Sequence, residues 1–217
     1  MKKTRKMKLN KLMMAFALVF ASGALFAACG SDSGGPAEPV DEGTDSAEAE
    51  AEAEAIGENP VVVMAIEGYG DIEIELDPAA APETVDNFLG LVDRGFYDGL
   101  TFHRIILGFM IQGGDPAGTG SGPGSGKTIK GEFAKNGWDN PISFERGVIG
   151  MARTDDFNSA SCQFFITNVD TPHLDGQYTA FGHVLSGMEV IDEISAIPTD
   201  SRDRPSSPVV IESIRIK

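Results

Sequence analysis

The sequence of 217 residues is poor in cysteine, tryptophan and basic side chains. Its two cysteines are too few for a disulfide-rich scaffold or a four-cysteine zinc site. Lys and Arg number 17 against 33 Asp and Glu, which gives a net charge of −16. Because affinity for nucleic acid comes mostly from basic residues that neutralise phosphates, this composition argues against a nucleic-acid partner. Hydrophobic residues make up 41% of the chain, enough for a sizeable core, so a wholly disordered protein is excluded.

No apolar run reaches the roughly 20 residues that a stable membrane span requires. The longest run covers residues 12–28 and follows a strongly basic start. A basic start, a short apolar middle and a small-residue finish predict a signal peptide over residues 1–28. The finish, Leu-Phe-Ala-Ala-Cys, resembles the lipobox of bacterial lipoproteins, although Phe26 stands where Leu is usual. This resemblance implies lipid modification of Cys29 and an extracytoplasmic, lipid-anchored protein on a bacterial membrane. The alternative is a plain cleaved signal with an incidental cysteine.

An acidic segment separates this signal from the rest of the chain. Residues 30–59 contain ten acids and no base, and they include an Ala-Glu alternation over residues 47–55. Like charges at helical spacing oppose a stable helix, and the apolar content is too low to order the segment. Residues 29–59 are therefore predicted to be an acidic disordered tether, which leaves residues 60–217 as one folded domain.

The hydrophobic pattern of this domain predicts many short strands and two helices. A β-branched run at 61–66 and strict alternation at 71–76 indicate two strands joined by a hairpin turn. Apolar residues at i, i+3, i+4 and i+7 predict an amphipathic helix over 82–95. Further strands are predicted over 101–106, 108–112, 147–151, 163–168, 179–184 and 209–216, and a second helix over 188–196. Short strands broken by Gly-rich turns favour a closed or nearly closed antiparallel barrel.

Several motifs of enzyme chemistry are incomplete. The glycine-rich stretch at 118–128 has Ser121 where a phosphate-binding loop needs Gly, and no helix start follows it, so a surface loop is predicted. None of the three histidines has the spacing of a metal motif, and no nucleophile elbow is present. Cys162 lies beside an apolar strand, which predicts a buried thiol rather than a nucleophile. Most carboxylates fall in the tether or on outward positions of strands, which argues against glycosidase chemistry.

Three segments carry a more specific signal. They read FHRIILGFMIQGGD at 102–115, QFFIT at 163–167 and HLDGQYTAFGHV at 173–184. In order and spacing the domain resembles the cyclophilin family of peptidyl-prolyl cis–trans isomerases over essentially all of 60–217. The resemblance implies a mainly β fold, a closed eight-stranded antiparallel β-barrel capped by two α-helices. It also implies an active site on the outer face of the barrel.

The resemblance assigns roles to residues of the first two segments. Arg104 matches the catalytic arginine of the family. Phe109, Met110 and Phe165 match the floor and walls of the proline pocket. Gln112 and Gln163 match polar groups that hold the substrate backbone. His103 is expected to point away from Arg104 into the packed interior, because neighbouring residues of a strand alternate.

The remaining positions are matched with departures from the family pattern. Leu174 and Tyr178 are expected to close the pocket, with Tyr178 standing where many eukaryotic members have His. Ala152-Arg153 opens a run that replaces the usual Ala-Asn-Ala, so a backbone contact to substrate is expected at Arg153. His173 stands where many members carry a Trp that is associated with tight cyclosporin binding. Sensitivity to that drug therefore stays open, whereas isomerase activity need not be affected.

Rotation about an X-Pro bond makes and breaks no covalent bond, so no nucleophile, metal or cofactor is expected. The predicted partners are proline-containing polypeptides, namely unfolded or exported chains, and the predicted assembly is a monomer. The competing hypothesis is a non-catalytic chaperone or scaffold that binds proline peptides in the same pocket. A two-lobed solute receptor is disfavoured, because the domain is small for two lobes around a cleft.

Overall fold

The computed structural model describes residues 59–122 and 124–217. The predicted signal peptide, Cys29 and the tether as far as residue 58 lie outside the described residues. Within the described part, eight strands pair antiparallel in one sheet, in the order β3-β4-β6-β5-β7-β2-β1-β8. Their bounds are β1 Val61–Ile66, β2 Gly70–Leu76, β3 Phe102–Ile106, β4 Met110–Gly113, β5 Val148–Met151, β6 Phe164–Thr167, β7 Thr179–Ser186 and β8 Ile211–Ile216.

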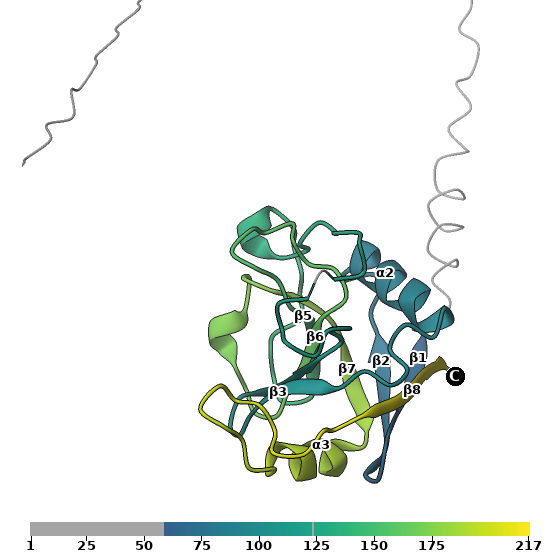
Figure 1. The fold of residues 1–217 in the computed structure, drawn as a ribbon. Coiled ribbons are helices and arrows are strands. Elements are labelled where there is room, and N and C mark those ends of the chain that lie inside the picture. Colours follow the sequence, from purple (N-terminus) through teal and green to yellow (C-terminus); the bar gives the residue numbers. More distant parts are fainter. Residues whose placement is uncertain (1–58, 123) are drawn as a thin grey trace, which may run out of the picture. The chain divides into compact units, whose positions relative to one another are not determined.

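The sheet curls until its two edges meet, as Figure 1 shows. Thr101, just before β3, forms a β-bridge with Val210, just before β8. Phe102 N–H also donates to the Val209 carbonyl at 3.0 Å. The predicted mainly β fold with eight antiparallel strands is confirmed. The sheet is joined to itself beside this bridge rather than along a continuous β3–β8 ladder.

Two α-helices of the described residues cover the sheet, as predicted. Helix α2, Pro82–Asp93, contacts β7 and β8, and helix α3, Met188–Ser195, contacts β2, β3 and β4 (Figure 1). Pro82 begins α2, where its missing N–H leaves no helical hydrogen bond unmade. Two short 3₁₀ turns, η1 Ala134–Asn136 and η2 Pro172–Leu174, were not predicted. No helix in the part of the chain that the structure describes has both the length and the apolar character to cross a membrane.

The inward face of the strands forms the main core. Along β1, Val62, Met64 and Ile66 are buried and alternate with partly exposed residues, as the two-residue period of a strand requires. Cys162 is fully buried in the same cluster, which confirms the predicted buried thiol. Burial raises the pKa of this thiol, so it is not poised as a nucleophile.

A second apolar cluster lies apart from this core. Strand β6 is buried on both sides, with Phe164 and Ile166 in the main core and Phe165 in the second cluster. The second cluster also contains Met110, Phe144, Val148, Leu174 and Ala180. A strand buried on both faces reads as a continuous apolar run, which is how Phe164-Phe165-Ile166 appears in the sequence. The outer face of β4, β5 and β6 is therefore covered, and the candidate site is built on it.

The first and last strands of the domain are neighbours. β1 pairs with β8, and Lys217 N–H donates to the Val61 carbonyl at 2.9 Å. The two ends of the folded domain thus lie side by side.

Candidate active site

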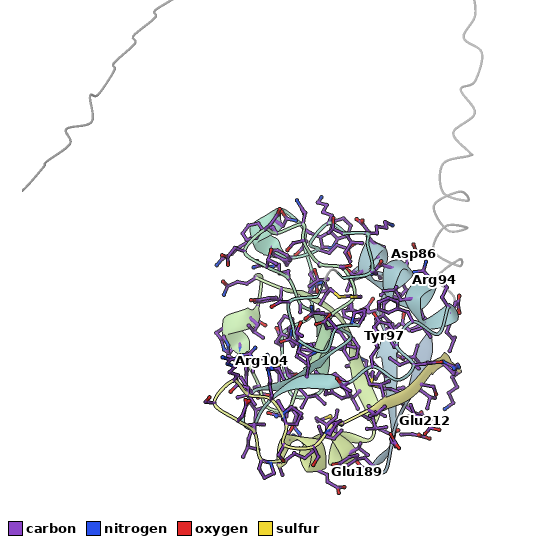
Figure 2. The ribbon with its side chains drawn as sticks, in the orientation of Figure 1. Asp86, Arg94, Tyr97, Arg104, Glu189 and Glu212 are labelled. Atoms are coloured by element: carbon purple, nitrogen blue, oxygen red, sulfur yellow. The ribbon has the colours of Figure 1, made fainter. Side chains whose placement is uncertain are left out.

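A cavity of about 470 Å³ opens beside β3, β4 and β6. It is lined by Arg104, Phe109, Met110, Gln112, Ala152, Arg153, Phe165, Leu174 and Tyr178, together with His103, Arg202, Arg204 and a short stretch of the glycine-rich loop. Every predicted site residue of the domain except Gln163 and His173 is in this lining. Segments separated by more than 60 residues in sequence are thus brought together around one cavity. Figure 2 labels Arg104, which lies near the edge of the molecule beside β3.

The two exceptions contact residues of the lining. Gln163 accepts a hydrogen bond from Gln112 Nε2 at 3.0 Å, and it lines a second cavity of about 460 Å³ that shares Gln112, Ala152 and Arg153. His173 stacks on Phe109, with ring centres 5.5 Å apart and planes at 30°. Both residues therefore lie at the rim of the predicted site rather than inside its main cavity.

A β-bulge in β3 changes the expected direction of His103. Arg104 pairs with Gln112 across the β3–β4 ladder, but the register shifts between Phe102 and Arg104, so His103 is an extra residue. His103 is buried as predicted, yet the prediction that it points away from Arg104 is wrong, because both residues line the same cavity. A bulge breaks the alternation on which that prediction rested. Burial lowers the pKa of His103, so the imidazole is neutral at pH 7.

Arg104 is paired with a residue that the sequence did not indicate. Its Nε lies 3.2 Å from Asp203 Oδ2, in the loop between α3 and β8. The Asp203 carbonyl also accepts the N–H of Ile105 at 2.8 Å, which attaches the loop to β3. Asp203 has φ of 61°, a left-handed conformation that Asp tolerates better than most residues. The bond to Nε engages one corner of the guanidinium and leaves its other donors available.

The apolar wall of the cavity is fixed by aromatic stacking. Phe165 stacks on Phe144 with ring centres 5.5 Å apart, and Tyr178 meets Phe165 edge-on at 5.8 Å. Gly150 allows this arrangement, since a Cβ at that position would lie 2.6 Å from both phenyl rings. Such contacts hold Phe165 in one orientation at the cavity.

Arg153 is held by three aromatic rings. Its guanidinium lies 4.7 Å from the ring centre of Tyr178, 4.9 Å from that of Phe157 and 5.1 Å from that of Phe133. Its Nε and Nη2 both donate to the Gln177 carbonyl, at 3.1 and 2.8 Å. Sequence reasoning assigned only a backbone role to this position. The structure adds that the side chain connects the segments that contain Phe133, Phe157 and Tyr178.

The glycine-rich loop is organised by one carboxylate. Asp115 accepts hydrogen bonds from the backbone N–H groups of Ala117, Thr119, Gly120 and Gly122, at 2.7 to 3.3 Å. Burial raises the pKa of Asp115, but the four N–H donors outweigh that effect and the net pKa is lowered. The loop is thus arranged around the Asp115 carboxylate. No group of three or more side chains that could hold a metal ion occurs in residues 59–122 and 124–217.

Comparison with known proteins agrees with this geometry. The family described as "Cyclophilin type peptidyl-prolyl cis-trans isomerase/CLD" matches residues 61–216. The chain belongs to this family. The match covers the whole sheet, both helices and every residue that lines the cavity, so this cyclophilin uses the complete fold rather than a fragment.

Individual relatives support the same assignment. Peptidyl-prolyl cis-trans isomerase A of Dickeya dadantii is 42% identical over 163 residues, which cover 71% of this chain and 83% of the relative. Peptidyl-prolyl cis-trans isomerase-like 1 of Neurospora crassa is 45% identical over 148 residues, which cover 68% of this chain and 88% of the relative. The isomerase-like 2 protein of Gibberella zeae is 41% identical over 148 residues, but the chain spans only 25% of its length.

A solved structure shows the same fold. The crystal structure of a Cryptosporidium parvum cyclophilin-type isomerase, determined in the presence of the dipeptide Ala-Pro, matches with a TM-score of 0.67 and 34% identity. The match covers 72% of this chain and 98% of that protein. Most of the uncovered part of this chain therefore corresponds to residues before the domain.

Proposed function

We propose that this cyclophilin catalyses the rotation of X-Pro bonds in exported polypeptides, with Arg104 as the catalytic residue of the cavity beside β3, β4 and β6. The observation that carries the proposal is the meeting of a half-exposed guanidinium with an apolar wall at one cavity. The similar cyclophilin crystallised in the presence of Ala-Pro supports proline as the group that this cavity accepts.

The mechanism follows from the resonance of the peptide bond. Rotation must break that resonance over a barrier of about 18–20 kcal/mol. In the twisted transition state the prolyl nitrogen becomes pyramidal and regains a lone pair, which a guanidinium N–H can bond. Arg104 then binds the transition state more strongly than the planar ground state, and differential binding of this kind lowers the barrier. Arginine suits the role because it stays charged and keeps its donors in a fixed plane.

The apolar residues hold the proline ring while the rest of the chain turns. Phe109, Met110, Phe165 and Leu174 all line the cavity, and we assign the first three to contact with the ring. Removing the ring from water also strengthens the arginine contact, because charge interactions grow as the local dielectric falls. Gln112 and Gln163 form one hydrogen-bonded pair next to Arg104, and we assign them to the substrate backbone.

The test is an isomerase assay on the full chain, with exchange between cis and trans peptide followed by NMR. Arg104→Ala is expected to reduce kcat/KM by about 100-fold, the size of effect seen when a transition-state donor is removed. Arg94→Ala is the matched control, because Arg94 is an exposed arginine outside the cavity. If the wild-type protein binds proline peptides but does not speed their exchange, the non-catalytic chaperone replaces the enzyme.

We further propose that the protein acts outside the cytoplasmic membrane, anchored by a lipid on Cys29. The support is the basic and apolar start of the chain, its small-residue finish before Cys29, and the acidic segment that follows. A labelled fatty acid should enter the wild-type protein in a bacterial host and be absent from Cys29→Ala. Label that persists in the Cys29→Ala variant would refute the anchor.

A further inference from the structure

The charged groups that line the cavity are all of one sign. Four arginines, Arg104, Arg153, Arg202 and Arg204, are in the lining, and no Asp or Glu is. The chain as a whole carries nearly twice as many acids as bases. In a protein this acidic, a cavity lined only by basic charged groups is a local reversal of sign.

Two of these arginines come from the loop that holds Arg104. Asp203 binds Arg104 and Ile105, so the neighbouring Arg202 and Arg204 are carried to the edge of the same cavity. Figure 1 shows this loop in yellow next to β3, and Figure 2 places the Arg104 label beside it. The loop therefore delivers two extra positive charges to a fixed place next to the catalytic arginine.

The acids of the loop are already engaged. Asp203 is paired with Arg104, and Asp200 Oδ1 accepts the backbone N–H groups of Arg202 and Arg204 at 2.8 and 3.0 Å. These hydrogen bonds, and then the charges of the two arginines, lower the pKa of Asp200. Within the part of the chain that the structure describes, neither Arg202 nor Arg204 forms an ion pair, and both are exposed. Their guanidinium groups are available to a ligand.

We propose that Arg202 and Arg204 are specificity-determining residues that make this cavity prefer proline peptides with an acidic side chain close to the proline. The proposal rests on the isomerase function stated above and names its substrate class. Guanidinium groups bind carboxylates through paired hydrogen bonds, and a site with one sign of charge raises the local concentration of the opposite sign. The exposed position of both arginines predicts a moderate preference that weakens as salt is added.

The test compares two peptides that differ only by Glu or Gln. The pair carries the variable residue one position before proline, and a second pair carries it one position after. Cis–trans exchange is followed by NMR with the full chain, without a protease, so no second enzyme adds its own preference. The test is made at about 10 mM ionic strength, where charges act over about 30 Å. In at least one of the two pairs, the Glu peptide is expected to have a kcat/KM about three- to tenfold above that of its Gln partner. The ratio should fall toward one at about 1 M salt.

Variants separate the loop from the rest of the protein. Arg202→Gln and Arg204→Gln should each reduce the Glu/Gln ratio, and the double variant should bring it close to one, mainly through a lower kcat/KM for the Glu peptide. Arg94→Gln removes the same charge outside the cavity and should keep the ratio. Equal rates for Glu and Gln peptides in the wild-type protein, or a preference that survives in the double variant, would overturn the inference and leave the isomerase function intact. Failure to catalyse any of the four peptides would instead overturn the proposed function, and this inference with it.

Discussion

Arg104 and Asp203 form an ion pair across 99 positions of sequence, with Nε and Oδ2 3.2 Å apart and the two side chains 41% and 40% exposed. The pair connects the middle of β3 to the loop after α3. It fixes the direction of the arginine on which the proposed mechanism depends, and it has no counterpart in the motifs that first indicated the family.

Loss of the Asp203 charge should slow the enzyme without unfolding it. In Asp203→Asn the left-handed backbone is still tolerated, but Arg104 loses its ionic partner. Because exposed ion pairs contribute about 0.2–1 kcal/mol, kcat/KM is expected to fall about two- to fivefold. Asp203→Gly also removes the side-chain acceptor and should lower activity further. Wild-type activity in both variants, measured by NMR exchange, would show that Asp203 does not position Arg104.

The cation of Arg153 should contribute mainly to stability. Arg153→Met keeps an extended apolar side chain but loses the two hydrogen bonds to Gln177 and the contacts with three aromatic rings. We expect the free energy of unfolding to fall by about 1–2 kcal/mol, as measured by urea denaturation. Arg153→Lys keeps the charge without the planar fork of donors. Its free energy of unfolding should lie between those of the wild-type protein and Arg153→Met. Unchanged stability in Arg153→Met would mean that the aromatic contacts contribute nothing.

A methyl group at position 150 should disturb the apolar wall. In Gly150→Ala the new Cβ would lie 2.6 Å from the rings of Phe144 and Phe165, so one of them must move. Such overpacking typically lowers the free energy of unfolding by about 1–3 kcal/mol, and we expect KM to rise as Phe165 shifts. Gly90→Ala is the control, because Gly90 lies exposed in α2 with open space around it. That substitution should stabilise the protein by about 0.5–1 kcal/mol and leave activity unchanged.

Acid should destabilise the domain through Asp115. The folded state lowers the pKa of this carboxyl below its ordinary value of 3.8, so the stabilisation is present above that value. This contribution to the free energy of unfolding is lost as the pH falls from 3.8, the ordinary pKa of the carboxyl, through its lower pKa in the folded state. Urea unfolding should therefore show a decline below about pH 4 to which Asp115 contributes.

Asp115→Asn should reduce this acid dependence and lower stability at pH 7 by about 1–3 kcal/mol, because an amide cannot accept all four N–H bonds. Asp139→Asn is the matched control, since Asp139 is exposed and its side chain makes no hydrogen bond within residues 59–122 and 124–217. An identical pH profile in Asp115→Asn and the wild-type protein would contradict this assignment.

The strands and helices could be predicted because their periodicity follows burial. The alternation of residues 61–66 and the helical spacing of Val85, Phe88 and Val92 each reflect one buried face, and the structure places them so. Predicted boundaries differ from the observed ones by at most two residues, as where β4 begins at Met110 rather than at 108. Most of the cavity lining followed from the order of family motifs, since those motifs come from adjacent strands.

The remaining features depend on contacts that no local pattern records. The bulge at His103 changes only the register of β3 against β4, and the segment still reads as an ordinary strand. The attachment of Asp203 to β3 depends on the path of a loop that is distant in sequence, and a run of alternating charges usually indicates a solvated turn. The aromatic contacts of Arg153 need Phe133, Phe157 and Tyr178, which meet only after the chain has folded.

The hydrogen bond between Lys217 and Val61 makes the folded domain almost a closed loop of chain. A linker of a few residues would join the two ends, and the polypeptide could then be opened at the β1–β2 hairpin turn without changing the sheet order. A reporter fused after Lys217 would leave the domain at the point where the N-terminal segment enters it. Groups attached at the two ends of the domain would therefore lie close together and could clash. A fusion partner at either end needs a linker long enough to keep it away from the other end.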